Sequence, residues 1–121
     1  MLEKRRFHRF RFTAPCELIH NDINYKGQLE NISLNGALIS FSDGVIVPQG
    51  EECILTFCPE GGNLPLRLVA KAIYSNFTII GIKFSTVDAE TRERLYNLMA
   101  RLSNEPEKLP LEQHQLEGYW E

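Results

Sequence analysis

The chain has 121 residues, of which 43% are hydrophobic and 24% charged, and its 13 Lys and Arg residues face 16 Asp and Glu residues. This length and composition predict one soluble domain with a modest core and exclude a chain that is disordered throughout. No apolar run is long enough to cross a bilayer, and the charged beginning lacks the apolar segment of a secretion signal, so we expect a cytoplasmic protein without membrane insertion.

Residues 1–9 are strongly basic, and we expect them to be a flexible ligand-binding arm. The arm contains Lys4, Arg5, Arg6 and Arg9, with only Glu3 to offset them. Positive charge concentrated in one place on an otherwise acidic chain attracts an anion. In an extended arm Arg5 and Arg9 point to the same side, where guanidinium groups can grip a phosphate or a guanine edge. The alternative is a solvated leader with no specific role.

Period-two alternation then predicts six short strands. In the first strand one face carries Phe10, Phe12, Ala14, Cys16 and Leu18. Pro15 lies within this strand, which indicates an edge position or a bulge. The other strands are expected near residues 23–30, 37–41, 53–58, 66–74 and 79–84, with Gly81 marking a bend or a close contact. Short strands joined by turns favour a mainly β fold, a six-stranded antiparallel barrel, because closure leaves no exposed edge.

After the sixth strand the pattern becomes helical. Asp88 is a suitable N-cap, and Pro106 lies where the helix should already have ended. The predicted apolar stripe of this helix, which should pack against the barrel, contains Leu95, Leu98, Met99 and Leu102. We therefore expect a barrel with a helix over residues 10–103 and an acidic tail over residues 104–121. For the tail, a short helix, a docked strand and disorder all remain open.

Three cysteines, Cys16, Cys53 and Cys58, lie inside the strand-like runs. No nearby histidines complete a four-ligand zinc site, so we expect no metal and three small buried side chains in a reducing compartment. The three histidines lack a carboxylate pair or nucleophile arranged with them, so we expect no enzymatic activity.

A small polar motif separates the second and third predicted strands. It reads Asn31-Ile32-Ser33-Leu34-Asn35-Gly36. A tight turn at Asn35-Gly36 is one explanation. The other is a ligand site, in which Asn31 and Ser33 point to the same side, and Gly36 permits a positive φ or the close approach of a ligand.

The two motifs together resemble those of the PilZ domain family. That family has Arg-x-x-x-Arg before the first strand, as at Arg5 and Arg9, and Asp/Asn-x-Ser-x-x-Gly between the second and third strands, as at Asn31, Ser33 and Gly36. The resemblance covers about residues 4–102. It implies a receptor for the bacterial second messenger cyclic di-GMP, with no other cofactor.

The resemblance also implies roles for single residues. Arg5 and Arg9 would clamp phosphates and contact guanine, and Asn31 would bind a guanine edge. Ser33 would contact a phosphate or a base, and Gly36 would leave room for the ring. Lys4 and Arg6 would add phosphate contacts.

We expect cyclic di-GMP to order the arm and so to switch the interaction with an unidentified downstream protein. One alternative is a PilZ-like adaptor that binds proteins without a ligand. A barrel for single-stranded nucleic acid is the other, and it would spread basic and aromatic residues over its strands. Because the basic residues here gather in one arm, we expect no DNA or RNA partner.

Overall fold

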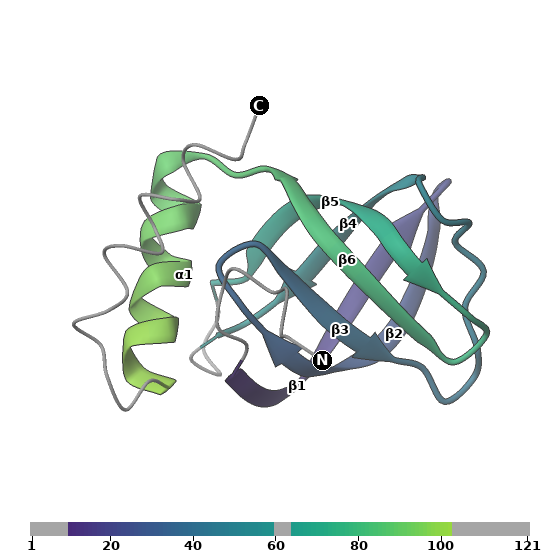
Figure 1. The fold of residues 1–121 in the computed structure, drawn as a ribbon, viewed down its shortest axis with the longest axis horizontal. Coiled ribbons are helices and arrows are strands. Elements are labelled where there is room, and N and C mark those ends of the chain that lie inside the picture. The colour runs from purple at the N-terminus through teal and green to yellow at the C-terminus, as the bar shows by residue number, and fades with distance from the viewer. Residues whose placement is uncertain (1–9, 60–63, 103–121) are drawn as a thin grey trace, which may run out of the picture.

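The computed structural model describes residues 10–59 and 64–102, which form six strands and one helix (Figure 1). The elements are β1 (Phe10–His20), β2 (Ile23–Ile32), β3 (Gly36–Ser40), β4 (Glu52–Phe57), β5 (Leu66–Ser75), β6 (Ile79–Thr86) and α1 (Ala89–Leu102). The strands close into an antiparallel barrel in the order β1-β2-β3-β6-β5-β4. The predicted mainly β barrel with a C-terminal helix is confirmed. The predicted arm and tail lie outside the described residues, so the division into three segments stays a prediction.

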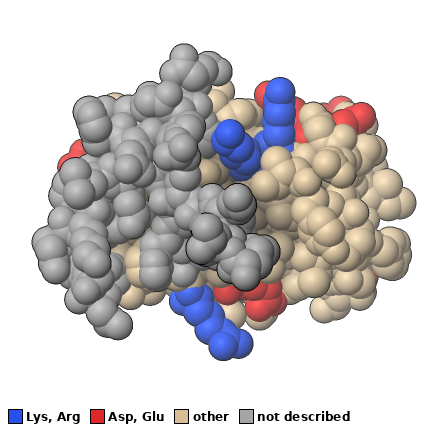
Figure 2. Space-filling view, viewed as in Figure 1, with Lys and Arg blue, Asp and Glu red and all other residues tan. Residues whose placement is uncertain are grey.

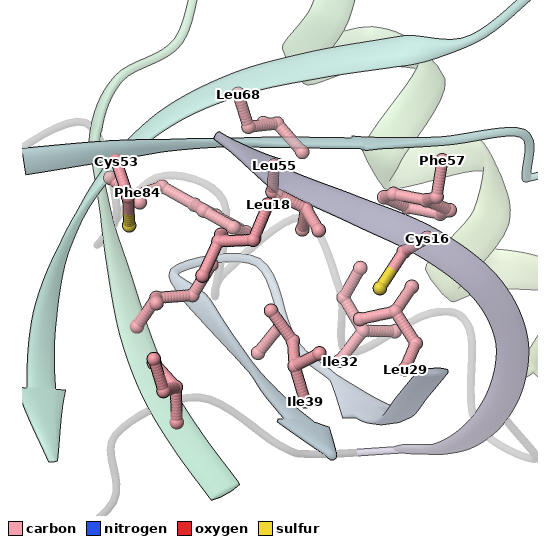
Figure 3. Close-up of a cluster of buried hydrophobic side chains, with 14 of the residues drawn as sticks. Cys16, Leu18, Leu29, Ile32, Ile39, Cys53, Leu55, Phe57, Leu68 and Phe84 are labelled. Carbon is pink, nitrogen blue, oxygen red and sulfur yellow. The ribbon is translucent and has the colours of Figure 1, made fainter. Parts of the chain in front are cut away.

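The barrel is held together by the side chains of alternate residues, which each strand points into the interior. Figure 3 shows these side chains pointing toward one another from all sides of the barrel. Each strand contributes at least one side chain with no exposed surface: Leu18, Leu29, Ile39, Leu55, Leu68 and Phe84. Removal of such apolar surface from water is the main force that favours this fold.

The turn between β1 and β2 contains two residues with left-handed backbone conformations. Asn21 and Asp22 have φ values of 51° and 66°, and they join the pair His20–Ile23. Asn and Asp tolerate this conformation better than other residues with a side chain, and a two-residue turn of this kind matches the twist of the strands.

Pro15 does not lie at an edge, because the barrel is closed. The strand pairing is irregular between Arg11 and Ala14, immediately before the proline. Pro15 is opposite Gln28 of β2, whereas pairing with β4 begins only at Cys16. Of the two expectations for Pro15, the edge position is therefore wrong and the neighbouring bulge is present.

Helix α1 packs at one end of the barrel, against β1 and β5 (Figure 1). The Asp88 carboxylate accepts a hydrogen bond of 2.7 Å from the Thr91 N–H, which confirms the predicted N-cap and lowers the pKa of Asp88. Leu95, Leu98 and Met99 are buried, as expected.

No helix within the described residues has the length and apolar composition needed to cross a membrane.

Two of the three free cysteines behave as expected. Cys16 and Cys53 are buried, whereas Cys58 is only half-buried. Burial raises the pKa of Cys16 to about 12, with a further contribution from the charge of Glu17. Burial likewise raises the pKa of Cys53 to about 11, and the charge of Glu52 adds to the effect. The fold therefore favours both thiols in their neutral form.

This preference makes the protein sensitive to alkaline pH. Thiols of the unfolded chain ionise near pH 9, whereas Cys16 and Cys53 stay protonated in the fold to about pH 12 and 11. The stabilisation by the two neutral thiols is thus complete well below pH 9. It declines as the pH rises, by at most about 1.4 kcal/mol per pH unit per thiol. We expect urea unfolding at pH 8 and pH 10 to show a steeper loss for the wild type than for Cys16→Ala/Cys53→Ala. Parallel losses would contradict this prediction.

Candidate functional site

The candidate site lies at the end of the barrel where β2 turns into β3. Lys4, Arg5, Arg6 and Arg9 lie outside the described residues, so their roles stay predictions. The first described residue, Phe10, is opposite Ile32, and this pair fixes where the basic arm joins the barrel. The arm is therefore attached next to the motif that runs from residue 31 to residue 36. The topology thus brings the start of β1 next to the second motif, although a whole hairpin separates the two in the sequence.

Ser33 organises the turn between β2 and β3. Its side chain has no exposed surface, and its Oγ accepts hydrogen bonds from the N–H groups of Asn35 and Gly36, each at 3.2 Å. The same Oγ lies 2.9 Å from the Asn35 Oδ1, to which it donates. The Ser33 N–H donates to the Gly36 carbonyl at 2.9 Å. The hydroxyl is thus engaged within the turn, and a direct contact between Ser33 and a ligand stays a prediction.

Gly36 is required by the barrel itself. Its φ is not positive, so the turn does not need a glycine for that reason. A Cβ at this position would overlap the carbonyl oxygen of Ile82 in β6. The neighbouring Asn35 carbonyl accepts a hydrogen bond of 2.8 Å from the Phe84 N–H. The close approach that we expected to serve a ligand is therefore already used by β6.

Asn31 takes its position from an irregularity in β2. Pairing between β2 and β3 shifts between Leu29 and Asn31, so that Leu29 and Ile32 both face the core although they are three residues apart. Asn31 is half-buried, opposite Leu38 of β3. Simple alternation predicted that Asn31 and Ser33 share a side, but Ser33 is fully buried after the chain leaves the strand.

The strand register places two basic residues beside this motif. Arg11, which is exposed, lies opposite Asn31, and Lys83, also exposed, lies opposite Gly36. Neither residue belongs to the two predicted motifs. Lys83 is separated from the motif by almost fifty residues, and only the order β3-β6 brings it there.

The described residues were also searched for a second site, such as a catalytic histidine or a metal site. His20 is buried near the β1–β2 turn, far along the barrel from the motif, and its Nε2 lies 2.7 Å from Glu51 Oε1. A cavity of about 520 Å³ lies beside this pair. Within residues 10–59 and 64–102, no group of three or more His, Cys, Asp and Glu residues is arranged to hold a metal ion.

Comparison with known proteins identifies related domains. The model of the PilZ domain matches residues 3–101. No curated protein matches the chain significantly. The PilZ domain of Escherichia coli YcgR, solved with c-di-GMP, has a TM-score of 0.70 and 14% identity, with 93% of this chain and 98% of that chain covered.

Two further solved structures share the fold over part of a longer protein. The Bacillus subtilis inhibitor of motility MotI/DgrA has a TM-score of 0.67 and 17% identity, with 83% of this chain and 52% of that chain covered. The K. pneumonia MrkH–c-di-GMP complex has a TM-score of 0.60 and 19% identity, with 94% and 56% covered. This chain thus spans about half the length of these two proteins. Because the family model matches most of the sequence, and the closed barrel agrees with it, the chain belongs to the PilZ domain family.

Proposed function

We propose that this protein is a non-enzymatic receptor for cyclic di-GMP. The observation that carries the proposal is the turn at residues 31–36. There the buried Ser33 hydroxyl binds the backbone of an Asn-x-Ser-x-x-Gly motif, next to the point where the basic arm joins β1. The solved structures of YcgR and MrkH with c-di-GMP add support, since both share this fold.

The ligand site would combine a fixed part with a charged part. Asn31 lies on the outer side of β2, where its carboxamide can bind the edge of a guanine. Arg5 and Arg9 would supply paired hydrogen bonds to phosphate and stack on the base. Because fixing each residue of an arm costs about 1–2 kcal/mol, several charge-assisted contacts must act together.

Ordering of the arm would then change the surface that the protein presents to a partner. An arm rich in like charges gains order when a dianion neutralises it. We propose that this change switches the interaction with a downstream protein in the cytoplasm. The PilZ-like adaptor without a ligand is the competing function, and the titration described next separates the two.

Isothermal titration calorimetry with cyclic di-GMP tests the proposal. We expect the wild type to bind with a Kd in the micromolar range or below, and Arg5→Ala and Arg9→Ala to weaken binding by at least about tenfold, because each loses a charge-assisted phosphate contact. The matched control is Lys26→Ala, which removes an exposed positive charge opposite Glu17, away from the motif. No heat from the wild type, at concentrations well above micromolar, would contradict the proposal. Conversion of the ligand to a linear product would show an enzyme instead.

A further inference from the structure

The outer face of the neighbouring strands β3, β6 and β5 carries apolar side chains. The inward side chains of β6 are fully buried, so its alternate residues Ile79, Gly81 and Lys83 face outward. By the same alternation Leu38 and Ser40 of β3 face outward. Antiparallel sheets usually place polar side chains on the face that meets water. Leu38 and Ile79 are therefore apolar residues at positions where polar ones are expected.

Three apolar side chains converge over Gly81, which is itself buried. A Cβ built on this glycine would lie 3.5 Å from the Tyr74 Cβ, 3.8 Å from the Leu38 Cδ1 and 4.0 Å from the Ile73 Cγ1. The pairing of β5 with β6 is irregular here, which brings two consecutive residues of β5 to the same surface. Ile73 and Tyr74 remain 47% and 54% exposed. We call Leu38, Ile73, Tyr74 and Ile79 the outer apolar patch.

The outer apolar patch continues to the tip of the β5–β6 hairpin. Phe77 is 64% exposed, and a Cβ on Gly44 would overlap its ring, so the ring lies directly on this glycine. The Val45 N–H donates a hydrogen bond of 2.9 Å to the Phe77 carbonyl, which holds the tip against the loop after β3. Figure 2 shows a broad surface with few charged side chains over this end of the barrel, where β5 and β6 meet in Figure 1. An exposed apolar surface of this extent marks an interaction site.

Charged groups border the patch on two sides. Lys83, which is exposed, lies two residues beyond Gly81 along β6, and Lys71 of β5 is directly opposite it. Two residues from Gly81 in the other direction, β6 pairs with Ser40, whose hydroxyl donates to the Glu30 carboxylate. Two residues of an antiparallel strand span about 7 Å. The patch thus has a basic border and an acidic border at equal distances from its middle row.

This arrangement of charges is complementary to itself. A two-fold axis that crosses the strands at the row of Gly81 turns one patch onto another and reverses the strand direction. The Lys83 border of each copy then lies over the Glu30 border of the other, because both borders are equally far from the axis. Within residues 10–59 and 64–102, neither Lys71 nor Lys83 forms an ion pair inside the chain. The repulsion between these two lysines would be relieved by a carboxylate of a second copy.

We propose that the chain forms a symmetric dimer through the outer apolar patch, with Lys83 of each copy beside Glu30 of the other. The inference goes beyond the proposed function and does not depend on it, because the contact requires no ligand. A lipid surface would also accept aromatic residues and lysines, but the Glu30 carboxylate at the acidic border is repelled by anionic lipid. A few side chains on a convex wall form a small contact, so the dimer should be weak.

Sedimentation velocity over a range of protein concentrations, without ligand, tests the inference. We expect the wild type to pass from monomer to dimer with a Kd of about 10–100 μM. Tyr74→Glu and Ile73→Glu should each weaken the dimer by at least about tenfold, because each places a charge inside the apolar contact. The matched control is Leu64→Glu. Leu64 is 72% exposed but lies beside α1, where its carbonyl accepts a hydrogen bond from Arg94, so association should be unchanged. Thermal unfolding checks that each variant is folded.

Charge reversal tests how the two copies are oriented. Lys83→Glu and Glu30→Lys should each weaken the dimer about fivefold, and the double variant should recover most of the wild-type affinity, because opposite charges meet again. A double variant that associates no better than the single variants would overturn the proposed contact. A wild type that stays monomeric up to about 1 mM would overturn the dimer, and its co-sedimentation with anionic vesicles would identify a lipid surface as the occupant. Neither measurement uses cyclic di-GMP, so the proposed function and this inference can fail separately.

Discussion

Replacement of Gly36 by alanine is expected to lower the free energy of unfolding by about 2–3 kcal/mol, because the new methyl group would overlap the carbonyl oxygen of Ile82. That oxygen belongs to the backbone of β6 and cannot rotate away as a side chain would. Either β3 and β6 separate locally, or the turn that precedes Gly36 shifts. The affinity for cyclic di-GMP should fall as well, since the same shift moves Asn31 and the turn. Chemical unfolding followed by titration measures both effects.

Gly81→Ala is the matched control for this prediction. Gly81 also faces outward on a strand of the same sheet, but a Cβ there has ordinary contacts only, the nearest being the Cβ of Tyr74 at 3.5 Å. Since alanine costs less conformational entropy than glycine on folding, Gly81→Ala should be as stable as the wild type or slightly more stable. Its affinity for cyclic di-GMP should also stay close to that of the wild type, because neither β3 nor the turn before Gly36 has to move. Equal stability of Gly36→Ala and Gly81→Ala would contradict the steric argument.

Replacement of Ser33 by alanine is expected to lower the free energy of unfolding by about 2 kcal/mol. The change removes the acceptor for the N–H groups of Asn35 and Gly36, at a side chain that has no exposed surface. A buried donor left without its partner costs about 1–3 kcal/mol. Binding of cyclic di-GMP should weaken in parallel, through the loosened turn. Urea unfolding with and without ligand measures the two effects.

Ser40→Ala provides the comparison for Ser33→Ala. Its hydroxyl donates a hydrogen bond of 2.5 Å to the Glu30 carboxylate, on a half-buried part of the surface. Water can replace this partner, so the loss should be within about 1 kcal/mol. A Ser33→Ala protein that keeps full stability and yet loses its ligand would show that the hydroxyl contacts the ligand directly. That result would contradict the structural role assigned to Ser33 here.

The barrel itself could be predicted from the sequence because burial in it is repetitive. Alternation from Phe10 to Leu18 and the helical stripe of Leu95, Leu98 and Met99 each reflect a face turned toward the same core. Asn21, Asp22 and Asp88 added local signals whose physical basis lies in a few neighbouring residues. Such signals do not depend on which strands pair, so they can be recognised from the sequence alone.

The geometry of the site could not be predicted in the same way. The irregularity between Leu29 and Asn31 inserts one residue into the alternation, and no residue type marks it. The fully buried position of Ser33 and the contact of Gly36 with Ile82 follow from that irregularity and from the pairing of β3 with β6. Arg11 and Lys83 are likewise brought to the motif by register alone.

The closed barrel also limits how a bound messenger can be sensed by another protein. Every strand already has a neighbour on both sides, so a partner cannot join by adding a strand of its own to an open edge. Moving one strand would break two ladders at once, which makes the wall a stiff frame. A partner must therefore detect the bound ligand through changes in side chains and in segments attached to the barrel. The strands themselves keep their positions.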